Sequence, residues 1–259
     1  MGRLCVLLTL VALLGCKHQG APSTDHSSGV ARALIVGIDP TTPPFESLDP
    51  KTNQPIGFDV DVMDQIGRII GAKIVYRIAD FKTVFDGLNS RQFDAVISAV
   101  TITDDRKKVV SFSDPYVDIA QVVAARKDNS RVKNVQDLSR NDALVGVQTG
   151  TTGEHLLLVD ALVQDKNLRR YDNVSLALAD LKVDAIDAVV DDQPILLNFL
   201  STPEFRGQLI VVGPLSQTES YGIVARKGDT ALLQQINAAI KRLRDEGVLD
   251  RLVVSYHLR

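Results

Sequence analysis

Residues 98–116 bring together side chains and amides that could bind an anion. They follow an apolar run that predicts a buried strand, and Thr103 then has the residue type of a helix cap. Arg106 falls in the first turn of that helix, where the helix dipole disfavours a cation, so a negative partner is expected. One candidate is a ligand carboxylate held by Arg106 and the free amides near Thr101. The other is exposed pairing of the basic residues with the two aspartates after Thr103, which would contribute little.

A second possible anion site lies in residues 148–153, which join a predicted strand to a predicted helix. Amides at a helix start carry the positive end of the dipole, so those of Thr151 and Thr152 could hold an anion. The alternative is an ordinary turn closed by a threonine cap. No Gly-Lys-Ser/Thr follows, so the segment is not a nucleotide phosphate loop.

Other chemistries have little support in the sequence. The histidines at 18, 26, 155 and 257 are scattered and both cysteines fall within the first 16 residues, so no metal site is expected. Neither a Gly-x-Ser-x-Gly elbow nor a Gly-x-Gly-x-x-Gly fingerprint occurs, and no cofactor is expected. The net charge of -3 and the lack of a basic stripe argue against a nucleic-acid partner.

The elements that must position these residues alternate between strands and helices. The 259 residues are 45% apolar and 24% charged, a composition typical of a globular protein with a sizeable core. The predicted strands are 34–38, 73–78, 94–100, 120–126, 143–148, 187–190, 209–212 and 221–226. The predicted helices are 58–70, 83–90, 152–163, 175–181, 194–200 and 230–245. This alternation predicts an α/β fold, in which ligands bind beyond the carboxyl ends of strands.

The first 31 residues have the composition of a targeting segment and a linker. Arg3 precedes an apolar run to Leu14 that is too short to span a membrane but fits a secretory signal. Residues 13–16 resemble the lipobox of bacterial lipoproteins, which implies a signal peptide over 1–15 and lipidation of Cys16. The alternative is an ordinary signal with an incidental cysteine. Residues 16–31 are mostly small and polar and predict a flexible tether.

One internal similarity bears on the domain organisation. Residues 122–128 and 222–228 are near copies, each an apolar run followed by Arg-Lys. They could be two edge strands, or two strands that connect an inserted lobe to a discontinuous outer one. In the second case two connections cross one waist and make a hinge.

Several motifs in order resemble the bacterial extracellular solute-binding proteins of the polar amino acid type, family 3, which feed ABC importers. The motifs lie at 36–39, 43–46, 56–62, 93–95, 101–116, 146–152 and 183–191. The resemblance covers nearly everything from Leu34 to Leu252. It implies the type II periplasmic-binding-protein fold, with two lobes, each a sheet flanked by helices, joined by two hinge strands. Lobe 1 would comprise 32–121 and 224–259, and lobe 2 would comprise 122–223.

The resemblance also implies how a ligand would be held between the lobes. Arg106 would contact the ligand α-carboxylate together with the Thr101 amide, and the amides of Thr151 and Thr152 would engage from lobe 2. Asp192, or Asp191 beside it, would hold the ligand ammonium. Asp192 also has an alternative role as a helix cap shortly before a proline.

The remaining positions are less conventional for this family. The carbonyl of Ala99 would be a second ammonium acceptor, without the serine hydroxyl that is common there. Asp39 would hold the ligand side chain or brace its turn. Phe81 would stack on the ligand or belong to the core. Thr42 stands where a second aromatic ring is usual, which weakens the case for a lysine- or arginine-like ligand.

These observations predict an amino acid-binding monomer, anchored by lipid in the periplasm or at the cell surface, that delivers its ligand to an ABC transporter permease. The rival is an enzyme on the same fold, since some cyclohexadienyl or arogenate dehydratases resemble these binding proteins and add a catalytic acid. Glu46 and Glu154 are the candidate acids here, and both are expected near the edge of the cleft.

Overall fold

The computed structural model describes residues 1–2, 32–129, 131–140 and 142–258. The predictions for the signal peptide, for Cys16 and for the tether fall outside these residues, apart from the first two positions. The chain divides into two compact units, Met1–Val30 and Ala31–Arg259, and the account below concerns the second unit.

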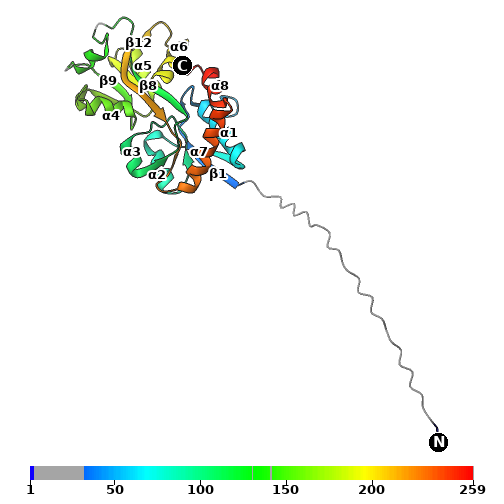
Figure 1. Cartoon of the computed structure of the whole chain (residues 1–259). Coiled ribbons are helices and arrows are strands. Elements are labelled where there is room, and N and C mark those ends of the chain that lie inside the picture. Colours follow the sequence, from blue (N-terminus) through cyan, green and yellow to red (C-terminus); the bar gives the residue numbers. More distant parts are fainter. Residues whose placement is uncertain (3–31, 130, 141, 259) are drawn as a thin grey trace. The chain divides into compact units, whose positions relative to one another are not determined.

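Two five-stranded sheets form the framework of this unit (Figure 1). The first sheet has the order β5 (Ala72–Ile78), β1 (Arg32–Ile38), β6 (Ala95–Val96), β13 (Val224–Arg226) and β7 (Val110–Phe112). The second has the order β10 (Leu168–Tyr171), β9 (Val145–Gln148), β11 (Ala188–Asp192), β8 (Val117–Arg126) and β12 (Leu209–Tyr221). Each sheet joins three parallel strands to an antiparallel neighbour, β13 in one and β8 in the other. A small antiparallel sheet consists of β2 (Thr41–Thr42), β3 (Glu46–Leu48) and β4 (Pro55–Ile56).

Helices pack on both sheets, so the predicted α/β fold with two sheet-centred lobes is confirmed. The first sheet carries α1 (Phe58–Ile70), η1 (Phe81–Thr83), α2 (Val84–Asn89), α3 (Asp104–Val109), α7 (Thr230–Asp245) and α8 (Val248–Ser255). The second carries η2 (Val135–Ser139), α4 (Thr152–Val159), η3 (Asp165–Asn167), α5 (Val174–Lys182) and α6 (Gln193–Ser201). None of the helices among the described residues combines the length and apolar character that crossing a membrane requires.

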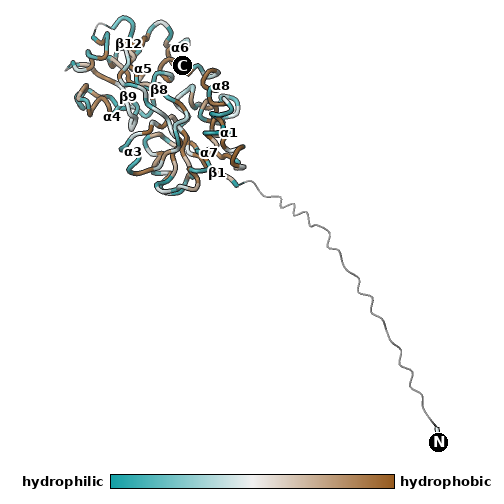
Figure 2. The backbone as a smooth tube through the Cα atoms, viewed as in Figure 1, coloured by the Kyte–Doolittle hydropathy of each residue, from teal (hydrophilic) through white to brown (hydrophobic). Residues whose placement is uncertain are grey.

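Alternating side chains give each sheet two apolar faces. In β8, Val122 and Ala124 join a large core cluster, whereas Val123 and Ala125 belong to a second cluster on the opposite face. Figure 2 shows brown, apolar segments throughout the folded unit. A strand covered on both faces reads as a continuous apolar run, which is why β8 and β11 were recognisable in the sequence.

Several predicted boundaries were wrong for local reasons. The strand expected over 94–100 is only Ala95–Val96, because the chain turns at Ala99, which has a φ of 48°. The helix expected to reach 163 ends at Val159. The strand expected over 221–226 is interrupted at Gly222, whose amide donates to the Val100 carbonyl instead of continuing the ladder. The short strands β7 and β10 and the last helix, α8, were not predicted.

The two similar segments near 122 and 222 lie in different sheets. β8 and β13 are therefore not partners, and the antiparallel neighbour of β8 at the edge of its sheet is β12. The pairing runs through Thr218–Ala120 to Tyr221–Val117, where β12 leaves the second sheet. Ile102 also donates its amide to the Ser220 carbonyl at 2.8 Å, which ties a turn of the first sheet to this end of β12.

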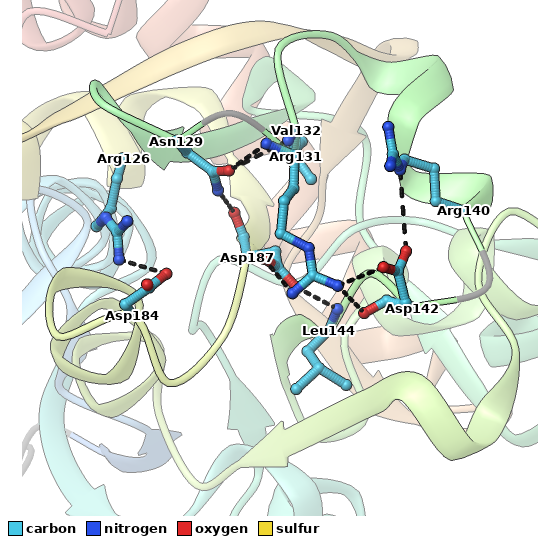
Figure 3. Close-up of polar contacts among 9 residues, drawn as sticks. All are labelled: Arg126, Asn129, Arg131, Val132, Arg140, Asp142, Leu144, Asp184 and Asp187. Atoms are coloured by element: carbon cyan, nitrogen blue, oxygen red, sulfur yellow. Dashed lines mark hydrogen bonds and ion pairs between the residues drawn. The ribbon is translucent and has the colours of Figure 1, made fainter.

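The connection from β8 to β9 is fastened by a buried asparagine (Figure 3). Asn129 Oδ1 accepts the amides of Arg131 and Val132, at 2.7 and 3.3 Å, and Asn129 Nδ2 donates to the Asp187 carbonyl at 2.8 Å. The Asp187 carboxylate in turn accepts the Leu144 amide at 2.8 Å. This network fixes the start of β11 against the start of β9, and both strands end at the cavity described next.

Candidate ligand-binding site

A small cavity lies where the carboxyl ends of strands from both sheets meet. Eight of the nine ligand-binding residues expected from the sequence line it: Thr42, Phe81, Ala99, Thr101, Arg106, Thr151, Thr152 and Asp192. Ser98, Gln148, Asp191 and Ile195 complete the lining. Asp39 does not line the cavity but accepts the Phe81 amide at 2.9 Å and the Gln148 side-chain amide at 3.3 Å. Parallel α/β sheets present loops for ligand binding at this edge, which explains the convergence.

Arg106 reaches from the first sheet to the second. Its backbone amide donates to Thr103 Oγ1 at 3.2 Å, so the predicted cap of α3 is confirmed. The guanidinium donates to the Thr101 carbonyl at 2.8 Å and to the Gly150 carbonyl at 3.0 Å, and it lies 5.5 Å from the centre of the Phe81 ring. Burial lowers the pKa of Arg106 to about 10, which leaves it cationic at neutral pH.

The aspartates after Thr103 pair with lysines and not with Arg106. Lys107 contacts Asp104 at 3.2 Å, and Lys108 contacts Asp105 at 2.6 Å, all on the exposed surface. Exposed pairing with the aspartates, one of the two interpretations of this helix start, therefore applies to the lysines, and the other, an anion site, is left to Arg106. The lysines are compensated by neighbouring acids, whereas Arg106 turns to carbonyls and an aromatic ring in the cavity.

The second sheet contributes the start of α4. Thr151 Oγ1 accepts the Glu154 amide at 3.4 Å, so the threonine-cap interpretation holds. The Thr151 amide donates to the Gln148 carbonyl at 3.4 Å, which corrects the expectation that it is free for an anion and leaves Thr152 as the better amide donor. Thr152 Oγ1 lies 3.3 Å from Thr101 Oγ1, so hydroxyls from the two sheets meet in the cavity.

Two adjacent carboxylates end β11 inside the cavity. Asp192 stands at the cap position of α6 without a side-chain capping bond, and it accepts instead from Gln121 Nε2 and the Tyr221 hydroxyl. Asp191 Oδ1 accepts the Asp192 amide at 2.6 Å, whereas Asp191 Oδ2 is buried without a partner among the described residues. Burial raises the pKa of Asp191 to about 7, and burial together with the charge of Asp191 raises the pKa of Asp192.

A second pair of carboxyl groups, Glu46 and Asp59, lies behind the cavity wall. Glu46 is fully buried and accepts from the Thr42 hydroxyl and, at 3.2 Å, from Ser98 Oγ. Asp59 accepts the Ala99 amide at 2.8 Å. Burial raises the pKa of Asp59 to about 6, and burial together with the charge of Asp59 raises the pKa of Glu46 well above its usual range. Glu46 is therefore not at the cleft edge as expected.

The other acid expected at the edge, Glu154, does not line the cavity either. Its carboxylate accepts from Arg170 Nε at 2.5 Å and from the Gly150 amide at 2.7 Å. The negative charge thus sits beside the start of α4, where it complements the helix dipole. No group of three or more potential metal ligands occurs among the residues with described positions.

Sequence reasoning missed five residues of this site: the polar Ser98, Gln121, Gln148 and Tyr221 and the apolar Ile195. Gln121 had a visible signal, because it is a single polar residue within the apolar run of β8. Gln148 and Ser98 lie at or just beyond a strand end, which is the general position of ligand contacts in this fold class. Tyr221 carried no signal, because its contact with Asp192 joins residues 29 positions apart on different elements.

The fold and the site together define a protein of two sheet-centred lobes that meet around a polar cavity, which is the architecture of a small-molecule binding protein. The sequence model of the bacterial extracellular solute-binding proteins, family 3, matches residues 34–259. The chain therefore belongs to this family.

Individual relatives agree with that assignment. A probable histidine-binding protein of Neisseria gonorrhoeae is 36% identical over 248 residues, which cover 95% of this chain and 91% of the relative. A solved ancestral arginine-binding protein bound to arginine is 34% identical with a TM-score of 0.79, covering 86% of this chain and 97% of that one. An ancestral amino acid-binding protein described as a precursor of cyclohexadienyl dehydratase is 31% identical with a TM-score of 0.78, covering 86% and 94%.

Proposed function

We propose that this protein binds a zwitterionic amino acid outside the cytoplasm and delivers it to an ABC transporter permease. The observation that carries the proposal is the arrangement of charge in the cavity. Arg106 from the first sheet and the carboxylates of Asp191 and Asp192 from the second sheet line the same space. An α-amino acid carries one carboxylate and one ammonium close together, so it matches both groups at once.

Each charged end of the ligand has a set of partners. Arg106 and the Thr101 amide would hold the α-carboxylate, with the Thr152 amide and the Thr151 turn closing from the second sheet. Asp192 would accept from the ammonium, together with the Ala99 carbonyl. Asp191 is the alternative acceptor, supported by its unpartnered buried oxygen. Phe81 would cover the ligand side chain.

Ligand contact with both lobes would favour closure. We place lobe 1 at 32–121 and 224–259 and lobe 2 at 122–223, with one crossing in β8 and the other between β12 and β13. A ligand shifts the balance between open and closed forms only by its difference in affinity for them, so contacts with one lobe alone would not close the protein. The closed form would be the one that the permease recognises.

The location follows from the N-terminal residues. A signal peptide over 1–15 and lipidation of Cys16 would anchor a monomer to the membrane in the periplasm or at the cell surface, with residues 16–31 as tether. The family description and the relatives named as periplasmic support export of the protein.

We propose binding and not catalysis. The candidate acids Glu46 and Glu154 do not line the cavity, and Asp191 and Asp192 are the only acids that do so among the described residues. This proposal assigns one or the other of them to the ligand ammonium. The relative that preceded a dehydratase is itself described as an amino acid-binding protein.

The replacement Arg106→Ala tests the proposal. We expect amino acid affinity, measured by titration calorimetry, to fall well over tenfold, because a buried ligand carboxylate would lose its charged partner. Arg140→Ala, which removes a half-exposed arginine outside the cavity, should leave the affinity unchanged. Equal affinity of the Arg106→Ala and wild-type proteins would refute the assignment.

A further inference from the structure

The wall of the cavity at Thr42 has a fixed hydrogen-bond polarity. Thr42 lies in β2 with 8% of its surface exposed, and it lines the cavity. That hydroxyl donates to Glu46 Oε1, which also accepts from Ser98 Oγ at 3.2 Å. A hydroxyl has one proton and two lone pairs, so once it donates to Glu46 it meets a ligand only as an acceptor.

The direction of this bond follows from the burial of Glu46. Its second oxygen, Oε2, has no hydrogen-bond partner among the described residues, although Glu46 is fully buried. The neighbouring carboxyl group is that of Asp59, which accepts the Ala99 amide at 2.8 Å and the Tyr116 hydroxyl at 2.9 Å. The contact between the two carboxyl groups raises the pKa of Glu46 and lowers that of Asp59, so the shared proton belongs to Glu46, on the oxygen that does not accept from Thr42 and Ser98. Oε1 then stays an acceptor, and Thr42 has to donate to it.

The groups beside Thr42 also present hydrogen-bond acceptors to the cavity wall. Ser98 Oγ donates to Glu46 and accepts the Asp39 amide at 2.9 Å, so its proton is also committed. Asp39 lies beside this wall with a carboxylate that accepts from Phe81 and Gln148. The wall therefore offers oxygen lone pairs and a nearby negative charge.

We propose that the ligand is an amino acid whose side chain donates a hydrogen bond and carries no negative charge, with Thr42 as its acceptor and Glu46 as the positioning residue that fixes the polarity of Thr42. This inference rests on the proposed function. Side-chain amides, imidazoles, guanidinium groups and hydroxyls fit the wall. A carboxylate would face lone pairs and Asp39, and an aliphatic side chain would leave a buried acceptor unpaired.

The first test compares free amino acids of similar size on the wild-type protein. Calorimetry with L-glutamine, L-histidine and L-arginine should include the tightest ligand, whereas L-glutamate and L-leucine should bind at least tenfold more weakly than that ligand. L-glutamine and L-glutamate are the sharpest pair because they differ mainly in one donor and one charge. Tightest binding of L-glutamate or L-leucine would overturn the inference and leave the proposed function intact. Absence of binding by all amino acids would overturn the proposed function, and this inference with it.

The second test changes the acceptor. Thr42→Val should weaken the tightest side-chain-donating ligand about tenfold, because it removes the acceptor with almost no change of volume. Thr42→Ser keeps the hydroxyl and should stay within about threefold of wild type. Equal affinities of the valine and serine variants would overturn the assignment of Thr42.

Glu46 is tested by two replacements that differ in hydrogen bonding. Glu46→Gln keeps an oxygen for Thr42 and a donor for Asp59, so the ratio of L-glutamine to L-glutamate affinity should be preserved. Glu46→Met removes the acceptor, frees the Thr42 proton and should reduce that ratio. A loss of the ratio in the folded glutamine variant would overturn the role of Glu46. Should the methionine variant not fold, the comparison of Thr42→Val with Thr42→Ser still decides the polarity of the wall.

Discussion

The surroundings of Asp192 determine whether its carboxyl group is protonated. Its carboxylate accepts from Gln121 and Tyr221, and Asp191, Glu219 and Arg106 act on it through their charges. Burial is the largest of these effects and raises its pKa. A carboxyl group in this state holds a proton that a bound ammonium would displace.

Ligand affinity should therefore depend on pH. Burial raises the pKa of Asp191 to about 7 and raises that of Asp192 well above its usual range, so the free protein holds protons on this pair near neutral pH. An ammonium stabilises the charged carboxylates and lowers their pKa, so binding releases protons and affinity should fall as the pH drops from about 8 to about 6. Calorimetry in buffers of different ionisation enthalpy measures this release. Affinity that stays flat over this range, with no proton release, would contradict it.

The sequence predicted some features of the site and not others. Arg106 and the threonines stood out because charged and small polar residues cluster at predicted strand ends, and eight expected residues do line the cavity. The hydrogen-bond partners of these side chains could not be predicted from the sequence. The Glu46–Thr42 contact requires a two-residue strand, β2, paired with β3, and such a short hairpin leaves no periodic pattern in a sequence.

At the scale of elements, regularity decided what could be predicted. α1 and α7 have the expected bounds because their buried residues recur every three or four positions over 13 and 16 residues. α1 also ends where expected because Gly71 adopts the left-handed conformation with a φ of 68°. β6 was overestimated because the apolar run continues past the ladder into the turn at Ala99.

The turn after β8 should contribute to stability and not to binding. Asn129→Ala removes the three hydrogen bonds that fasten the connection to β9 and leaves the amides of Arg131 and Val132 without their acceptor. We expect a loss of about 2 kcal/mol in the free energy of unfolding, or roughly 4–8 °C in Tm, with unchanged ligand affinity. Asn134→Ala, which removes one exposed capping bond of η2, should have a smaller effect. Equal Tm shifts in the two variants, measured by calorimetry, would show that burial of Asn129 adds nothing.

At the scale of the whole folded unit, an ion pair outside the cavity also links the two sheets. Lys82, in η1 beside the first sheet, contacts Asp172, just after β10 of the second sheet, at 2.7 Å. The side chains of Lys82 and Asp172 are 42% and 70% exposed, so salt screens the attraction between them. The pair touches both lobes without lining the cavity, and it therefore favours closure independently of the ligand.

Lys82→Met should weaken amino acid binding by up to about fivefold at low salt, which corresponds to the strength of an exposed ion pair. The difference from wild type should disappear at about 1 M salt, where the Debye length is about 3 Å. Lys107→Met is the matched control, because Lys107 pairs within α3 and does not join the lobes. The idea fails if calorimetry finds the same affinity change in both variants, or a change in Lys82→Met that salt does not reduce.

The pairing of β8 with β12 has a mechanical consequence. Residues 117–120 and 218–221 hydrogen-bond to each other where the chain leaves the second sheet, so the two strands form one ribbon and not two separate tethers. Sliding or stretching such a ribbon breaks its ladder, whereas twisting or bending it leaves the bonds in place. The lobes would then move relative to each other by twisting and bending of this one ribbon. A small molecule that fixes both motions would determine the geometry of the entire outer surface.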